Sequence, residues 1–162
     1  MTDIAEKLLA LTYRALRQED HNGHNTIREI EAMIGEKLPE DYTEFLSAFS
    51  STGACYELVS VRGIETSDFA KDGCYPWNIL YANSRESSSN ILDILEESSH
   101  RWLGYLAIGE DIFGNKFFMS LSKNDFGSIL FSEMTSEIYS EFYRISNSFY
   151  DFIDRTFVEK LD

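Results

Sequence analysis

Two histidines near the start of the chain are the first residues to test for metal chemistry. His21 and His24 lie three positions apart beside Asp20, and histidine together with carboxylate can hold zinc. The sequence around them offers no third convergent ligand, so a solvated polar loop explains these residues better. We therefore expect no metal site in this protein.

The two cysteines do not indicate redox or nucleophilic chemistry. Cys55 and Cys74 form no C-x-x-C pair, and two isolated cysteines in a chain of this length are typical of free thiols in a reducing compartment. His100 lies far from both cysteines in the sequence and next to Arg101, without the flanking pattern of a nucleophile and its base. A polar position at the end of a helix accounts for His100.

Adjacent carboxylates are the remaining candidates for acid–base catalysis. Glu96 and Glu97 form one pair, and Glu110 and Asp111 form another. Neither pair has a neighbour in the sequence that would tune one member for proton transfer. The chain also contains no G-x-S-x-G, H-E-x-x-H, G-x-G-x-x-G or Walker-type glycine motif. We therefore predict a protein without catalytic residues or cofactors, which is not an enzyme.

The segment from 63 to 86, which we call the variable arm, combines aromatic residues with carboxylates. It contains Gly63, Gly73 and Pro76, and so long a connection inside a compact domain is usually functional or mobile. Its carboxylates are Glu65, Asp68 and Asp72, and its aromatic residues are Tyr75, Trp77 and Tyr81. One alternative is that the aromatic residues fold back onto the core. The other is a protein interface, in which aromatic residues anchor a partner while these carboxylates, together with Glu110 and Asp111, meet its lysines or arginines.

The charge of the whole chain favours a protein partner over a nucleic acid. Its 162 residues contain 14 lysines and arginines against 28 aspartates and glutamates, which gives a formal net charge of −14. This field repels phosphate backbones and anionic lipids, and it attracts a basic protein. Hydrophobic residues make up 43% of the chain, enough to expect a single packed domain over residues 1–162.

Neither a membrane helix nor a signal peptide is indicated. No apolar run approaches the roughly 18 residues that a membrane helix needs. The opening MTDIAEKLLALTYRALR carries acids where a signal peptide carries bases. We therefore expect a cytoplasmic protein with no membrane partner.

Helical periodicity predicts three helices in the first third of the chain. One covers residues 3 to about 17, and together with the loop that follows it precedes the core of the domain. A second begins at Thr26, which forms a capping box with Glu29, and ends at Gly35. A third begins at Pro39. The third helix turns Tyr42, Phe45, Leu46 and Phe49 inward.

The middle of the chain favours strands. CYELVSV, at residues 55–61, is short and rich in β-branched and aromatic residues. The segment from Trp102 to Phe131 predicts a β-meander of three strands, in which Met119 opposes Ile129 and Phe117 opposes Phe131. Phe118 and Leu130 then share the other face of the sheet. Either another element covers these two residues, or they form a patch that binds a partner.

Two further helices complete the predicted fold. A short helix covers residues 90–97, and the last runs from about Phe142 to Lys160. The last helix turns Phe142, Ile145, Phe149, Phe152 and Ile153 inward. This order of elements predicts an α+β fold, in which a mainly antiparallel twisted sheet packs against N-terminal helices and a C-terminal helix.

Three segments carry a resemblance to a known family. The run TIREIEAMIGEKLPEDYTEFLSAFSSTG resembles the signature of the SUKH superfamily, the Smi/Knr cell-wall-regulator-like proteins. The residues that match it are Glu31, Gly35, Leu38, Pro39, Tyr42 and Gly53. WLGYLAIGEDIFGNKFFMSL followed by GSILF is similar to the family's strands, and the matching residues are Gly114, Asn115, Gly127 and Ile129. ISNSFYDFI is similar to its closing segment, through Ser148, Phe149, Phe152 and Ile153.

The resemblance runs from about residue 26 to 157 and supports the fold more strongly than the function. It implies an immunity protein, or antitoxin, that neutralises a secreted polymorphic or contact-dependent bacterial toxin, often a nuclease, by stoichiometric binding. The partner would be a basic toxin domain. The alternative that the resemblance implies is a non-catalytic intracellular regulatory scaffold, like the fungal members.

Overall fold

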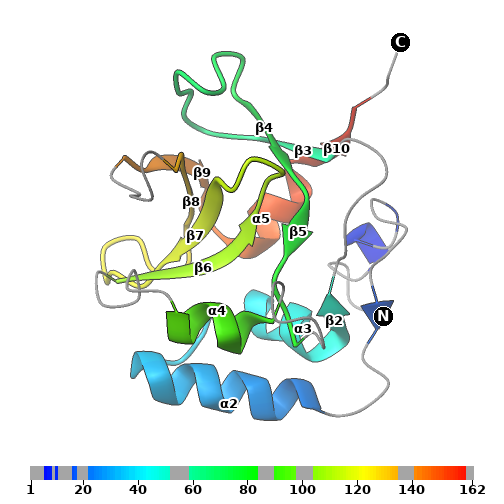
Figure 1. The fold of residues 1–162 in the computed structure, drawn as a ribbon, viewed down its shortest axis with the longest axis vertical. Helices are drawn as coiled ribbons and strands as arrows, with labels where there is room; N and C mark the ends of the chain where they lie inside the picture. The colour runs from blue at the N-terminus through cyan, green and yellow to red at the C-terminus, as the bar shows by residue number, and fades with distance from the viewer. Residues whose placement is uncertain are drawn as a thin grey trace.

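The fold combines two main antiparallel sheets with a set of short helices (Figure 1). The computed structural model describes residues 6–8, 10, 16–17, 22–51, 59–83, 90–97, 104–134 and 141–159. Its elements in chain order are β1 (Leu16–Arg17), α2 (Asn22–Ile34), α3 (Glu40–Ala48), β2 (Phe49–Ser51), β3 (Val59–Arg62), β4 (Cys74–Trp77), β5 (Ile79–Leu80), α4 (Ile91–Glu97), β6 (Tyr105–Glu110), β7 (Lys116–Ser120), β8 (Ile129–Ser132), β9 (Tyr143–Ser146), α5 (Phe149–Asp154) and β10 (Thr156–Val158). The predicted α+β class is confirmed.

The larger sheet is a five-stranded antiparallel meander in the order β5-β6-β7-β8-β9. Its centre has the predicted register, because Phe117 pairs with Phe131 and Met119 pairs with Ile129. The alternation of apolar residues along β7 and β8 explains this success, since a slip of one residue would turn Phe117 and Met119 to the opposite face. A smaller sheet has the order β10-β3-β4 and is also antiparallel.

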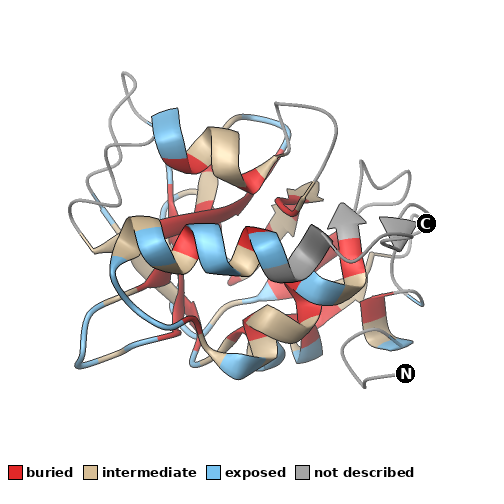
Figure 2. Ribbon diagram, turned by 90° about the horizontal axis from the view of Figure 1, so that it is seen from below, coloured by how far each residue is buried: buried red, intermediate tan, exposed pale blue. Residues whose placement is uncertain are grey.

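The N-terminal helices differ from the prediction in where they begin. Helix α2 begins at Asn22, so Thr26 lies inside the helix and is buried, and the predicted capping box at its start is wrong. Gly35 follows the helix with φ +74°, as its predicted role in ending α2 requires. Helix α3 begins directly after Pro39, one residue later than predicted. Figure 2 shows the buried stripe of α2 alternating with its exposed face.

The predicted helix over residues 3–17 lies mostly outside the described residues. Residues 6–8 and 10 are helical, and Leu8 is buried. The helix does not reach residue 17, because Leu16 and Arg17 form β1, which pairs with β2.

The predicted long C-terminal helix is wrong. Residues 142–160 contain strand β9, the short helix α5 and strand β10. Ser148 separates the first two, since its extended backbone precedes α5 and its hydroxyl accepts a hydrogen bond from the N–H of Asp151 at 3.0 Å. Such a cap fixes a helix start. Ile145 and Phe149 are both buried, as predicted, but they are buried from a strand and a helix.

The variable arm is shorter than predicted. Its irregular loop covers residues 63–73, and β4 and β5 follow it, while residues 84–86 lie outside the described part of the chain. Pro76 is tolerated because β4 is an edge strand, where a missing backbone donor costs least. The predicted strand at 55–61 corresponds to β3 at Val59–Arg62, and residues 55–58 lie outside the described part of the chain.

Aromatic contacts join the two sheets and the helices into one core. The ring of Phe117 lies 5.4 Å from that of Phe131 and 5.5 Å from that of Phe152. Phe152, on α5, also contacts Trp77 of β4 at 6.0 Å between ring centroids. Tilted and edge-to-face geometries of this kind add to the stability gained by burying the rings.

The hydroxyl of Tyr42 is a polar group in this apolar core. Tyr42 has no exposed surface, and among the described residues its hydroxyl finds no hydrogen-bond partner. Burial raises the pKa of Tyr42. A buried hydroxyl without a partner costs free energy, because water no longer solvates it.

Replacing Tyr42 by Phe therefore removes a penalty and keeps the ring. We expect the free energy of unfolding, measured in urea, to stay the same or rise by about 1 kcal/mol. Tyr75→Phe is the matched control, because the Tyr75 hydroxyl donates to the backbone oxygen of Glu65 at 2.9 Å, and its loss should cost about 1 kcal/mol. A destabilisation by Tyr42→Phe as large as that of the control would contradict this account.

Candidate protein-binding surface

The loop at residues 63–73, which we call the acidic loop, is fixed to the edge of the larger sheet. The N–H of Ile64 donates to the backbone oxygen of Ile145 at 3.1 Å, and the N–H of Glu65 donates to that of Arg144 at 2.9 Å. In return, the Glu65 carboxylate accepts the N–H of Arg144 at 3.1 Å. Glu65, predicted to meet a partner, therefore also holds the loop on β9.

All three predicted carboxylates of the acidic loop, Glu65 included, are exposed. Asp68 is exposed, and so is Asp72, whose carboxylate accepts the N–H of Cys74 at 3.0 Å. Lys71 lies between them in the sequence. The loop thus presents three acidic residues and one basic residue, a formal charge of −2.

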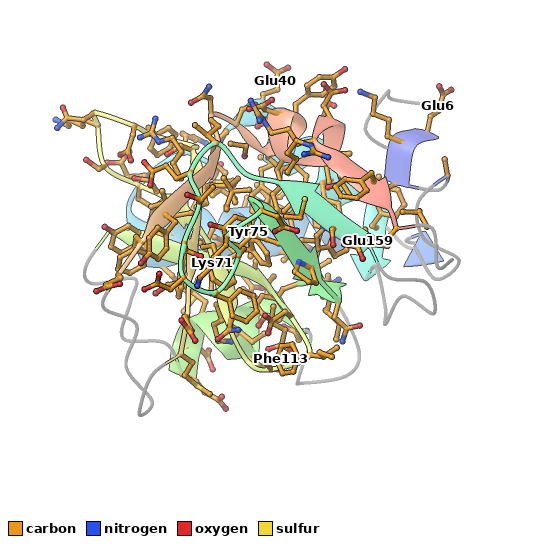
Figure 3. All side chains as sticks on the ribbon, turned by 90° about the horizontal axis from the view of Figure 1, so that it is seen from above. Glu6, Glu40, Lys71, Tyr75, Phe113 and Glu159 are labelled. Carbon is orange, nitrogen blue, oxygen red and sulfur yellow. The ribbon has the colours of Figure 1, made fainter. Side chains whose placement is uncertain are left out.

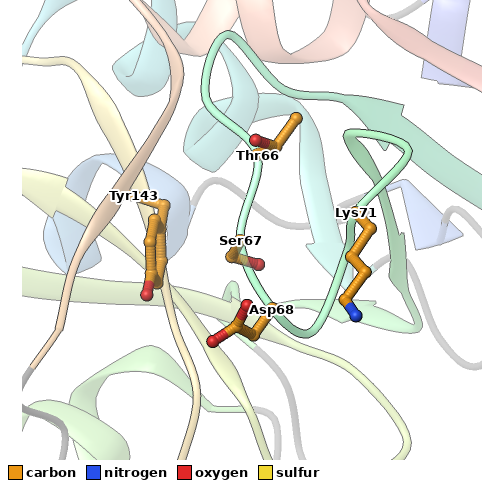
Figure 4. A pocket seen from close by; sticks show the side chains of 5 residues that line it. All are labelled: Thr66, Ser67, Asp68, Lys71 and Tyr143. Carbon is orange, nitrogen blue, oxygen red and sulfur yellow. The ribbon is translucent and has the colours of Figure 1, made fainter.

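A shallow open pocket of about 380 Å³ lies between the acidic loop and β9 (Figure 4). Its lining residues are Thr66, Ser67, Asp68, Lys71 and Tyr143. The Tyr143 hydroxyl donates to the Glu141 carboxylate at 2.7 Å, which raises the pKa of Tyr143 to about 12. Tyr143 therefore remains protonated at neutral pH, and the pocket offers hydroxyl groups and one charge of each sign.

The aromatic residues of the variable arm belong to the core. Tyr75 and Tyr81 have no exposed surface, and Trp77 is 2% exposed. The Tyr75 ring lies 4.8 Å from that of Phe131, and the Trp77 indole N–H donates to the Thr156 hydroxyl at 3.4 Å. The structure thus supports the first alternative for these three residues, because their surfaces already pack inside the protein.

Phe118 and Leu130 are also covered. Phe118 has no exposed surface and Leu130 is 7% exposed. The ring of Phe142 lies 5.6 Å from that of Phe118 and stacks on Tyr105 at 4.3 Å. Residues from β6 and from the segment before β9 thus supply the cover that the sequence left open.

Glu110 belongs to a polar network at the start of the β6–β7 hairpin. Lys116 Nζ donates to the Tyr81 hydroxyl at 2.8 Å, and that hydroxyl donates to Glu110 at 2.8 Å. Lys116 and Glu110 also form an ion pair at 3.8 Å. Burial lowers the pKa of Lys116, and the charge of Glu110 opposes this shift.

Asp111 is buried and organises the hairpin turn. Its carboxylate accepts the N–H of Phe113 at 2.8 Å, the N–H of Asn115 at 3.0 Å and the side-chain amide of Asn115 at 2.8 Å. Burial raises the pKa of Asp111, and these hydrogen bonds oppose the shift. The amide oxygen of Asn115 in turn accepts the N–H of Met134 at 2.9 Å. Asp111 is only 3% exposed. It therefore acts on the surface by holding the turn in place, and its carboxylate does not face solvent.

The turn presents exposed apolar side chains that the sequence analysis missed. Ile112 is 71% exposed and Phe113 is 65% exposed. Phe69 of the acidic loop lies against Phe113 with ring centroids 6.3 Å apart, and Figure 3 shows Phe113 on the same side of the molecule as Lys71.

Met134 adds a further exposed apolar side chain next to this turn. Met134 is 41% exposed, and a Cβ on Gly114 would lie 3.2 Å from its methyl group. We call Phe69, Ile112, Phe113 and Met134 the hairpin-tip patch.

The described residues contain neither a cluster of metal ligands nor a membrane-spanning helix. No three His, Cys, Asp or Glu side chains among them gather as a metal site would require. Of the metal and catalytic candidates, His21, Cys55 and His100 lie outside the described part of the chain. None of the described helices has the length and apolar character needed to cross a membrane.

Comparison with known proteins identifies the family. The family model of SMI1/KNR4 (SUKH-1) matches residues 24–155. The chain belongs to the SMI1/KNR4 (SUKH-1) family. It is also similar to the SPbeta prophage-derived uncharacterized protein YokK of Bacillus subtilis, with 30% identity over 171 aligned positions that cover 94% of this chain and 83% of that protein. The resemblance seen in the sequence is confirmed, and the SUKH family includes toxin immunity proteins and is generally non-catalytic.

The SUKH signature residues join the helices to the sheet. Glu31, on α2, accepts the N–H of Leu38 at 3.0 Å and so fixes the connection to α3. Gly127, in the turn between β7 and β8, has φ +86°, and a Cβ there would lie 3.1 Å from Pro39. The left-handed backbone of this turn, together with its close approach to the start of α3, therefore favours glycine.

Replacing Asp111 by Asn tests how far the turn of this SUKH protein depends on the carboxylate. An amide would turn a donor toward at least one of the N–H groups that donate to Asp111, so we expect the free energy of unfolding, measured in urea, to fall by about 1–3 kcal/mol.

The effect of this substitution should also depend on pH. Burial raises the pKa of Asp111 from its ordinary 3.8, so folding favours the protonated form. The stability that the protonated Asp111 contributes is fully present below pH 3.8, the unfolded pKa, and is lost as pH rises through the folded pKa. The difference in the free energy of unfolding between wild type and D111N should therefore become smaller as pH rises from 3.8 through the folded pKa of Asp111.

Asp68→Asn provides the control for this experiment. It removes the same charge from an exposed side chain, so the free energy of unfolding should change by less than about 0.5 kcal/mol. Equal effects of the two substitutions would mean that net charge, rather than the buried hydrogen bonds, determines the result.

Proposed function

We propose that this protein is an immunity protein that neutralises a secreted bacterial toxin, of the nuclease class, by stoichiometric binding in the producing cell. Family membership supports this proposal, because the SUKH family includes toxin immunity proteins. The observation that carries it is the exposed acidic loop, which is fixed to β9 and turns Asp68 and Asp72 toward solvent.

The acidic loop suits the recognition of a basic protein. A nuclease domain binds a polyanion and therefore carries a basic groove. The carboxylates of Asp68 and Asp72 can pair with the lysines and arginines of such a groove, and the net charge of −14 adds long-range attraction. Glu65 and Glu110, which the sequence also assigns to the interface, each have a partner within the protein as well. A protein that covers the groove blocks substrate without any chemistry of its own.

Survival assays test this function directly. The protein should rescue cells that express the catalytic domain of its cognate secreted toxin, and the two proteins should purify together at a ratio of one to one. The toxin whose gene neighbours this one is the first to try. Rescue of no toxin, combined with binding to host proteins, would favour the regulatory scaffold and overturn the proposal.

Neutralising two carboxylates tests the role of the acidic loop. The double variant Asp68→Asn, Asp72→Asn keeps the acceptor for Cys74 and removes two charges. We expect the association rate with the toxin domain to fall about 3–10-fold at low salt, with little change in the dissociation rate, because exposed charges mainly steer encounter. Stopped-flow measurement over a range of salt concentrations would detect this change.

Glu29→Gln, Glu36→Gln is the matched control. Both side chains are exposed on or next to α2, which lies at the opposite end of the molecule from the acidic loop (Figure 1). The net charge changes equally, so an equal loss of association rate would show that total charge acts alone and that the acidic loop is not the contact surface.

A further inference from the structure

Ile112 and Phe113 expose two large apolar side chains to solvent. They are the two most exposed large hydrophobic residues among the described residues, and they are adjacent at the end of a hairpin. The described ring contact of Phe113 is the edge-to-face contact with Phe69. Two such neighbours leave a large apolar area in water, which is typical of a recognition site when polar groups surround it.

Hydrogen bonds fix the backbone of the turn that carries these two side chains. The N–H of Asp111 donates to the backbone oxygen of Asn115 at 3.0 Å, and the Asp111 carboxylate accepts the N–H groups of Phe113 and Asn115. Gly114 supplies the left-handed conformation, with φ +87°, that closes the turn. A side chain presented on a fixed backbone loses little conformational entropy on binding, so more of its contact energy becomes affinity.

The hairpin-tip patch is continuous with the core. Phe69 stacks on Phe131 with ring centroids 5.2 Å apart, and Phe131 lies in the centre of the larger sheet. Met134, the fourth member of the patch, contacts the turn at Gly114 and Asn115. Phe69 therefore connects Phe113 to the packed side chains of the core.

The charges around the patch select its occupant. Residues 63–73, 110–116 and 133–134 contain six acidic and two basic residues, a formal charge of −4 over 20 residues, against −14 over all 162. The density of negative charge here is about twice the average of the chain. A second copy of this protein would bring two such fields together and be repelled. The charge fits a protein whose apolar pocket is bordered by lysine or arginine.

From these observations we infer that Ile112 and Phe113 insert into an apolar pocket of the toxin, bordered by basic side chains, and provide the main anchor of the complex. This inference rests on the proposed function, and it assigns a second task to the same surface. The acidic loop speeds encounter, and the hairpin tip slows dissociation.

Phe113→Ala tests the anchor against the toxin domain that the wild-type protein neutralises in the survival assay. We expect the Kd to rise about 100-fold, mainly through the dissociation rate, with an unchanged dependence of the association rate on salt. Adding Ile112→Ala should raise the Kd further. Hydrogen exchange of the complex should slow at residues 110–115. Thermal unfolding should show that Phe113→Ala remains folded.

Phe126→Ala is the matched control. Phe126 is 37% exposed in the turn between β7 and β8, at the opposite end of β7 from Phe113, and its loss should change the Kd less than about 3-fold. An unchanged Kd for the folded Phe113→Ala variant would overturn the anchor and leave the proposed function intact. A wild-type dimer that Phe113→Ala dissociates would also overturn it, since the patch would then bind a second copy. Neutralisation of no toxin would overturn the proposed function and the anchor together.

Discussion

The packing of aromatic rings on one face of the larger sheet is the interaction on which the rest of the fold depends. Phe117 and Phe131 occupy the centre of that face, and Phe152 of α5 rests on Phe117. Trp77 brings the smaller sheet to the same place through its contact with Phe152. The sheets and α5 therefore share one buried surface, and loss of a central ring would loosen all of them together.

This shared core explains which parts of the fold could be predicted. The register of β7 and β8 follows from alternation alone, because each strand has one apolar face that must point inward. The end of the chain was harder, since Ile145, Phe149 and Phe152 fit a helical period as well as they fit a strand followed by a short helix. Ser148 carried the available signal, as a serine ahead of an acidic first turn is typical of a helix start.

The candidate binding surface could be predicted only in part, for a related reason. The carboxylates of Asp68 and Asp72 form a cluster of charge that is visible in the sequence. The sequence around Tyr75 and Trp77, in contrast, predicts an irregular arm, because their strand has only four residues and includes a proline. Ile112 and Phe113 look like ordinary strand residues in the sequence. Their exposure follows from the turn that Asp111 builds, so the D-x-x-G-N spacing was the one local signal that could have indicated it.

The pairing of β10 with β3 has a consequence for how the protein acquires its shape. Thr156 pairs with Val61, a separation of 156 minus 61, or 95 residues. Closing so large a loop is entropically costly, and contacts of high sequence separation slow folding. The acidic loop directly follows β3, and its backbone is also tied to β9. A chain that has collapsed without completing these distant pairings would therefore lack an ordered acidic loop, so the protein could bind the proposed partner only after these pairings have formed.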